Sequence, residues 1–126
     1  MGMLNRRAEP RIALQMFLNQ YVKDRAHRCL ATNVSPGGLY VNRLPSLWDD
    51  TTQVIGLEFE LPGTSETIWA RGEIRFNTVD PYFHCTGIQI TGIANSHQRL
   101  LRDYVVENRV RELRRLLATI RRNRLQ

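Results

Sequence analysis

Apolar and polar side chains alternate along most of the chain up to about residue 90, which is the pattern of strands that bury one face. In the segment 12–22, one face is expected to carry Ile12, Leu14, Met16 and Leu18. The same pattern predicts further strands at 27–34, 39–41, 53–61, 67–76 and 83–90. Turns rich in Gly, Pro and Asp separate these segments. Six or seven short strands with regular turns predict a mostly β fold, namely a small antiparallel barrel.

Two of these strands carry polar residues whose direction matters for function. In the segment 67–76, the outward face is expected to hold Trp69, Arg71, Glu73 and Arg75. In the segment 27–34, strict alternation places Cys29, Ala31 and Asn33 on one face and Leu30, Thr32 and Val34 near the other. Asn33 is therefore expected to share a face with Cys29.

The chain from Asn95 to Arg124 has a different period, that of a helix. Asn95 or Ser96 is expected to cap its first turn. The 4-3-4-3 spacing of a coiled-coil seam is followed by Val106, Val110, Leu113, Leu117 and Ile120. Roughly 30 residues at 1.5 Å each give about 45 Å, longer than a small barrel is wide. We therefore expect the far end to project or self-associate, in preference to packing wholly on the barrel or contacting nucleic acid or a membrane surface.

Length and composition indicate one globular domain. We expect a barrel over 1–95, with an N-terminal arm at 1–11, and a helical extension of the same domain over 96–126. No apolar run approaches the ~18 residues of a membrane span, and the N-terminus lacks the apolar segment of a signal peptide. A cytoplasmic location is the resulting expectation.

The net charge of +6 comes almost entirely from arginine, because Lys23 is the single lysine among 18 basic residues. Arginine binds phosphates bidentately and stacks on bases, so nucleic acid is one possible ligand. A single-strand binder would interleave aromatic and basic residues on one sheet face, which only Trp69 with Arg71 and Arg75 approximates. A nucleic-acid binder is therefore the third choice of function.

A short stretch, Asn33 to Gly38, combines polar side chains with a turn. Asn33 and Ser35 are two residues apart, so their side chains leave the same face of a strand. Pro36 holds Ser35 extended, and Pro36-Gly37 fits a type II turn with φ > 0 at Gly37. Gly38 allows a close approach to the backbone. This arrangement suits the hydrogen-bonding edge of a flat ligand; the alternative is a hairpin corner that faces water.

Arginines also mark the N-terminal arm. Arg7 and Arg11 have the spacing RxxxR, and Arg6 precedes them. Pro10 keeps Glu9 out of the helical region, so we expect these arginines on a loop. An anionic ligand would neutralise their mutual repulsion and pin the arm in place. The alternative is a solubilising basic tail.

The two stretches together, RxxxR and then [D/N]xSxxG, flank the first hairpin and resemble the PilZ family of cyclic di-GMP receptors. The resemblance covers about residues 5 to 95. The later PilZ strands are also similar to this chain, which has Arg75 and then Gly87-Ile88-Gln89-Ile90. Ile90 replaces the aromatic residue that is usual at the end of this motif. It implies a PilZ-type barrel with cyclic di-GMP as ligand and no cofactor.

The resemblance also implies a role for individual residues. Arg7 and Arg11, joined by Arg6, would contact the phosphates and guanine edges. Asn33 and Ser35 would hydrogen-bond a guanine, and Gly38 would permit the close turn. Arg71 and Arg75 are weaker candidates for extra contacts, the alternative being ion pairs with Glu73 or Glu58.

The expected function is a bacterial second-messenger receptor that changes conformation and acts on an unidentified protein effector in motility, surface attachment, biofilm or exopolysaccharide control. The alternative is a PilZ-like interaction subunit that binds little or no nucleotide and acts through its C-terminal helix, which could also form a homodimer. An enzyme is not expected, because the sequence shows no Ser-His-Asp set or paired carboxylates. A metal site is disfavoured, since His84 and the adjacent Cys85 point to opposite faces of a strand. Cys29 and Cys85 are expected to pack as small apolar residues.

Overall fold

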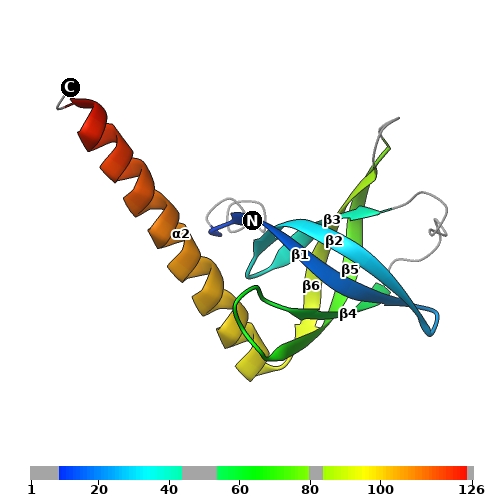
Figure 1. Ribbon diagram of the computed structural model, residues 1–126. Coiled ribbons are helices and arrows are strands. Elements are labelled where there is room, and N and C mark those ends of the chain that lie inside the picture. The colour runs from blue at the N-terminus through cyan, green and yellow to red at the C-terminus, as the bar shows by residue number, and fades with distance from the viewer. Residues whose placement is uncertain (1–8, 44–53, 80–83, 125–126) are drawn as a thin grey trace.

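The computed structural model describes residues 9–43, 54–79 and 84–124, which form six strands and one long helix (Figure 1). The elements are β1 (Ile12–Val22), β2 (Arg25–Ser35), β3 (Gly38–Arg43), β4 (Val54–Glu60), β5 (Thr67–Val79), β6 (His84–Ile93) and α2 (Asn95–Arg124). All strand pairs are antiparallel, and the strands close into a barrel in the order β1-β2-β3-β6-β5-β4. The predicted small barrel with a long C-terminal helix is confirmed.

The barrel interior holds the apolar face of each strand. On β4, Ile55, Leu57 and Phe59 are buried while Val54 and Glu60 are exposed, as the alternation predicts. The remaining buried apolar residues are Ile12, Met16, Leu18, Cys29, Ala31, Val34, Leu39, Val41, Leu61, Ile68, Ile88, Leu101 and Val105. The last two come from α2 and are fully buried, so the first turns of the helix complete the core.

A β-bulge on β2 changes which side chains point inward. Ala31 pairs with Val41 of β3, but Asn33 pairs with the next residue back, Tyr40, which leaves Thr32 as an extra residue. Ala31 and Val34 are therefore both fully buried. The prediction that Asn33 shares a face with Cys29 and Ala31 is wrong, because the bulge reverses the alternation between them. As a result, Asn33 and Ser35 flank the inward Val34 and face away from the core.

The β2–β3 turn also differs from the prediction. Ser35 pairs with Gly38 across Pro36-Gly37, but among the described residues only Lys23, Asp24 and Gly63 have positive φ. The type II turn with φ > 0 at Gly37 is therefore wrong. Gly37 and Gly38 are needed for space: a Cβ on Gly37 would lie 2.8 Å from both Glu9 carboxylate oxygens.

At Gly38 the close approach is confirmed, but the neighbour is the protein itself. A Cβ there would overlap the backbone carbonyl oxygen of Ile88 on β6. The Ile90 N–H donates to the Gly37 carbonyl at 2.8 Å, so β6 passes tightly beneath the turn. The glycines therefore hold two strands together at this corner of the barrel.

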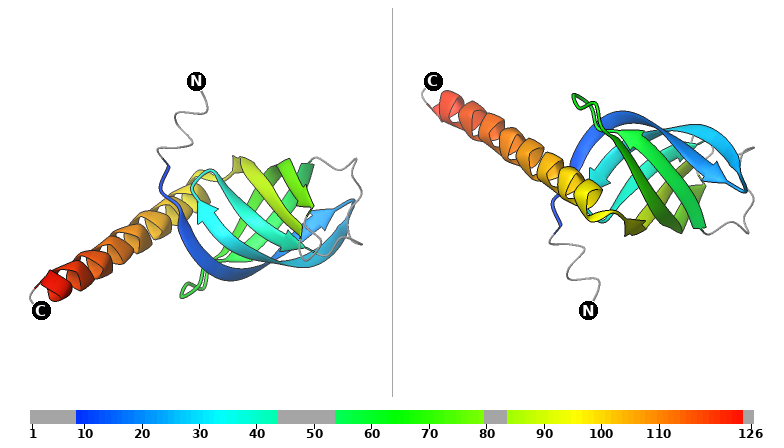
Figure 2. Two further views of the ribbon diagram at one scale, coloured as in Figure 1. Left: turned by 90° about the horizontal axis from the view of Figure 1, so that it is seen from above. Right: turned by 90° about the horizontal axis from the view of Figure 1, so that it is seen from below.

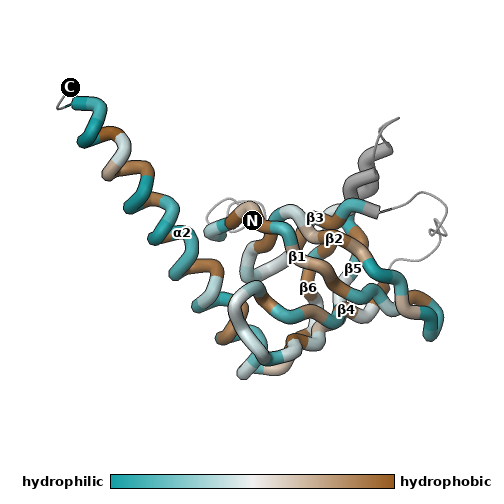
Figure 3. Tube along the Cα trace, in the orientation of Figure 1, coloured by the Kyte–Doolittle hydropathy of each residue, from teal (hydrophilic) through white to brown (hydrophobic). Residues whose placement is uncertain are grey.

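The helix α2 runs away from one end of the barrel (Figures 1 and 2). Its first hydrogen bond goes from the Gln98 N–H to the Ala94 carbonyl at 2.9 Å, so Ala94 holds the capping position instead of Asn95 or Ser96. The Trp69 N–H donates to His97 Nδ1 at 3.3 Å, which ties the first turn to β5. Beyond Val105, apolar residues recur every three or four positions along the part of the helix that projects from the barrel (Figure 3). Within the described ranges, no helix combines the length and apolar character needed to cross a bilayer.

Candidate functional site

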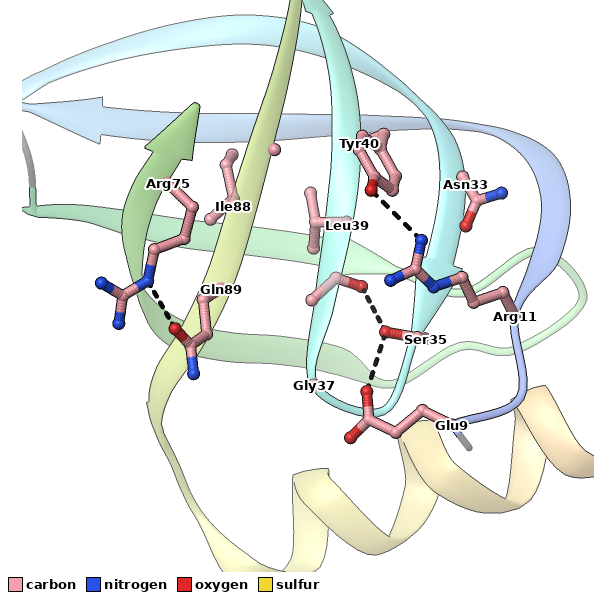
Figure 4. Close-up of a pocket in the computed structure, with 12 residues that line it drawn as sticks. Glu9, Arg11, Asn33, Ser35, Gly37, Leu39, Tyr40, Arg75, Ile88 and Gln89 are labelled. Atoms are coloured by element: carbon pink, nitrogen blue, oxygen red, sulfur yellow. Dashed lines mark hydrogen bonds between the residues drawn. The ribbon is translucent and has the colours of Figure 1, made fainter. Parts of the chain in front are cut away.

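A pocket of about 120 Å³ opens where the β2–β3 turn meets β6 and the chain that leads into β1 (Figure 4). It is lined by Glu9, Arg11, Asn33, Ser35, Gly37, Gly38, Leu39, Tyr40, Arg75, Gly87, Ile88 and Gln89. Four of the sequence-predicted site residues are thus brought together: Arg11, Asn33, Ser35 and Gly38. The other two, Arg6 and Arg7, lie outside the described residues.

Arg11 is held over the pocket by Tyr40. A terminal nitrogen of its guanidinium donates to the Tyr40 hydroxyl at 3.1 Å, and its Cζ lies 5.4 Å from the centre of the Tyr40 ring. The ring therefore contributes a cation–π contact as well as an acceptor. A guanidinium has five N–H donors, so this contact leaves most of them for a ligand. Tyr40 was not among the predicted site residues; its signal in the sequence is an aromatic residue two positions after Gly38.

The hydroxyl of Ser35 lies at the base of the pocket, where Glu9 covers it. Its Oγ is 3.4 Å from Glu9 Oε2 and 3.3 Å from the Gly38 carbonyl oxygen, and Ser35 is buried. The single hydroxyl proton can be donated to only one of these two acceptors at a time. Figure 4 shows the Glu9 carboxylate reaching from the N-terminal segment onto Ser35 beside Gly37. A negative charge of the protein thus occupies one side of the pocket.

Asn33 carries an unused acceptor. Its Oδ1 is buried and has no hydrogen-bond partner among the described residues. A buried acceptor without a donor typically costs about 1–3 kcal/mol. Such groups are rare in folded proteins, and one that lines a pocket beside an arginine indicates a place for a ligand donor.

The opposite wall of the pocket is formed by Arg75 and Gln89. The Arg75 Nε–H donates to Gln89 Oε1, and a terminal nitrogen of Arg75 lies 3.2 Å from Glu73 Oε2. The ion pair with Glu73 is the one that the sequence allowed for, and the same arginine also faces the pocket. Arg71, the other weak candidate, does not line it. Two guanidinium groups, of Arg11 and Arg75, therefore stand on opposite sides of the opening.

Catalytic and metal chemistry find no support in the described ranges. No group of three or more His, Cys, Asp or Glu side chains is arranged there to hold a metal ion. Cys29 is only 5% exposed and packs in the core, as expected of it; the Cys85 side chain lies outside what the structure describes. The described residues of the site supply hydrogen-bond donors and acceptors, two guanidinium groups and one carboxylate. Such a set of groups is suited to binding a polar ligand.

Comparisons with known proteins agree with this geometry. The family model described as the PilZ domain matches residues 5–107. No curated protein matches the sequence. Among solved structures, the inhibitor of motility MotI/DgrA of Bacillus subtilis has a TM-score of 0.74 at 21% identity over 84% of this chain. The chain spans about half of that protein, 52% of its length.

Two further structures share the fold. The PilZ domain of YcgR from Escherichia coli, solved with c-di-GMP, has a TM-score of 0.63 at 15% identity, covering 90% of this chain and 98% of that one. PlzA of Borreliella burgdorferi, in complex with c-di-GMP, has a TM-score of 0.52 at 22% identity, covering 82% of this chain and 42% of that one. At these identities the likeness shows a common barrel.

Proposed function

Because the chain belongs to the PilZ domain family, we propose that it is a cytoplasmic receptor for cyclic di-GMP that signals through a protein partner. Two structures that share its fold, those of YcgR and PlzA, were solved with that ligand. The similarity to MotI/DgrA, an inhibitor of motility, suggests motility as an output; surface attachment and exopolysaccharide control are the others we consider. Catalysis has no part in this function.

The observation that carries the proposal is the buried Asn33 Oδ1 without a donor, beside the largely unused donors of Arg11. Guanine has both counterparts: its N1–H and N2–H₂ groups donate, and its O6 and N7 accept. In this arrangement Asn33 and Ser35 meet the guanine donors, while the Arg11 fork spans O6 and N7. A guanine base would thereby donate a hydrogen bond to Asn33 Oδ1, which is buried and has no partner among the described residues.

The phosphates of the ligand call for more positive charge than Arg11 supplies. Cyclic di-GMP has two phosphodiesters and carries two negative charges, and Arg75 stands on the far wall of the pocket. Arg6 and Arg7 precede Glu9 by three and two residues in the sequence, and we propose that they supply the rest of this charge. The pocket of about 120 Å³ is smaller than a typical small-molecule site of roughly 300–1,000 Å³. We therefore infer that the N-terminal arm supplies the remaining wall by closing over the ligand.

Glu9 has to move for this to happen. Its carboxylate lies on Ser35 and over Gly37, where the guanine edge is proposed to bind, and it would repel the phosphates. Release of Glu9 from Ser35 would reposition the segment that leads to Arg11. Ligand binding would thus change the conformation of the arm, which is the signal that a protein partner could read.

The test is a calorimetric titration of the full chain with cyclic di-GMP, with GTP as a specificity control. We expect saturable binding near micromolar affinity, and loss of at least tenfold in affinity for Ser35→Ala. Arg71→Ala is the matched control, since Arg71 is exposed and lies outside the pocket. Absence of binding by the unmodified chain would remove the proposal.

The second candidate function is a PilZ-like interaction subunit that binds little or no nucleotide. It is favoured by one observation, the row of exposed apolar residues on the projecting half of α2. An unmodified chain that fails to bind cyclic di-GMP while it associates through α2 would support this function instead.

A further inference from the structure

The projecting part of α2 carries six large apolar side chains that touch no part of the barrel core. Their exposed fractions are 42% for Val106, 40% for Val110, 43% for Leu113, 57% for Leu116, 53% for Leu117 and 47% for Ile120. Five of them form the seam with 4-3-4-3 spacing, and Leu116 flanks it. Figure 3 shows apolar residues recurring at intervals along this part of α2, and Figure 2 shows it extending away from the barrel. Exposed apolar residues that share one face of an unsupported helix are the mark of an interaction surface.

We propose that this seam joins two copies of the chain through antiparallel packing of their α2 helices. The interface would place Val110 of one copy against Leu113 of the second, and Val106 against Leu117. The barrel contacts α2 through its first turns, where Leu101 and Val105 are buried and Leu100 and Tyr104 pack against the core; none of these residues belongs to the seam. This inference does not depend on the ligand.

The charges beside the seam decide the orientation. In heptad terms, Glu107 and Arg114 stand on one flank, and Arg109 and Leu116 stand on the other. In a parallel pair, opposite flanks meet, so Arg109 would face Arg114 of the second copy twice. In the same pair, Arg102, one heptad before Arg109, would face Glu107 twice. In the antiparallel register above, like flanks meet, so Glu107 faces Arg114 of the second copy twice and Arg109 faces Leu116. Both orientations therefore offer two attractions, but only the parallel pair adds two repulsions, which favours the antiparallel pair.

The net charge of the helix adds a second expectation. Nine arginines and three acidic residues lie between Asn95 and Arg124, so two copies repel each other at long range. Salt screens this repulsion, with a Debye length of about 10 Å at 0.1 M that falls to about 3 Å at 1 M. We therefore expect the dimer to tighten as salt is added. An acidic partner protein bound at the same helix would show the opposite trend.

Sedimentation equilibrium of the full chain over a micromolar concentration series, at low and high salt, measures this association. We expect a monomer–dimer equilibrium that Leu113→Glu shifts to monomer by at least tenfold in the dissociation constant, since it places two charges in the seam. Ala118→Glu is the matched control: it adds the same charge to α2 on an exposed position outside the seam, and it should leave the dimer intact.

The orientation is tested by exchanging two charges at about 0.15 M salt, where the Debye length of about 8 Å still lets paired charges interact. Glu107→Arg alone should weaken the dimer about threefold or more, and the double variant with Arg114→Glu should restore it, since each flank regains an ion pair. Arg114→Glu alone should weaken an antiparallel dimer but strengthen a parallel one, where it removes an Arg–Arg contact. A chain that stays monomeric at every concentration, or that dimerises equally well with Leu113→Glu, overturns the proposal and leaves the seam to a different protein.

Discussion

The carboxylate of Glu9 lies 3.4 Å from the hydroxyl of Ser35 and directly beside Gly37, in the corner of the pocket that the guanine edge is proposed to occupy. An acidic side chain from the arm thus stands in the place of a ligand acceptor. It is part of the same segment that carries Arg11, so the pocket is emptied of Glu9 either by rotation of its side chain or by movement of the arm.

Removal of this side chain should favour the ligand. Glu9→Ala is expected to raise the affinity for cyclic di-GMP by roughly fivefold, equivalent to about 1 kcal/mol, because one competing contact and one negative charge disappear. Calorimetric titration measures the change. Glu66→Ala removes an equal charge from an exposed site away from the pocket and serves as the control. Weaker binding by Glu9→Ala would mean that Glu9 supports the bound state.

The arginines of the arm should contribute directly to ligand affinity. Arg7→Ala or Arg11→Ala is expected to reduce the affinity at least tenfold, since each loses charge-assisted hydrogen bonds worth about 1.5–3 kcal/mol. The melting temperature should stay within a few degrees, because Arg11 is exposed and contacts only Tyr40 among the described residues. Unchanged binding by both variants would exclude the arm from the site.

Substitution of Asn33 should raise the stability of the protein and lower its affinity for the ligand. Asn33→Leu removes the buried acceptor that lacks a partner, so we expect the free energy of unfolding to rise by up to about 1 kcal/mol. The same variant should lose most of its affinity for cyclic di-GMP. Chemical denaturation and calorimetry on one preparation report both quantities. A variant that is less stable and still binds would show that Asn33 has a structural role only.

The two neighbouring glycines should respond very differently to the same substitution. Gly38→Ala drives a Cβ into the Ile88 carbonyl oxygen on β6, which cannot move freely, and should destabilise the barrel by about 2 kcal/mol or more. Gly37→Ala meets only the flexible end of Glu9 and should cost well under half as much. Denaturation midpoints compare the two. Equal losses would contradict the assignment of Gly38 to strand packing.

Much of the fold was predictable because local chemistry decides it. The bounds of β1 and of α2 coincide with the predicted segments, since an alternating strand pattern and a long helical period leave little choice. The face of Asn33 was not predictable from alternation, because the bulge at Thr32 arises from the pairing of β2 with β3. A single strand carries no information about the register of its neighbour.

The candidate site shows the same division. Arg11, Asn33, Ser35 and Gly38 could be named from two short motifs. Glu9 and Tyr40 could not, since their part in the pocket depends on contacts across 26 and 29 residues of chain. The prediction for Gly37 was wrong: its φ is ordinary, and its lack of a side chain leaves room for the Glu9 carboxylate.

The short connection from β6 into α2 links the wall of the pocket to the far end of the helix. Gln89 forms a wall of the pocket, and the helix begins only six residues later, at Asn95. The helix is about 45 Å long and is anchored in the barrel core by Leu101 and Val105, which would act as its pivot, or fulcrum. The tip lies about 29–35 Å beyond that fulcrum, so a tilt of about 10° sweeps it through roughly 5–6 Å. A small displacement of β6 at the pocket wall would therefore become a displacement of several ångströms at Arg124.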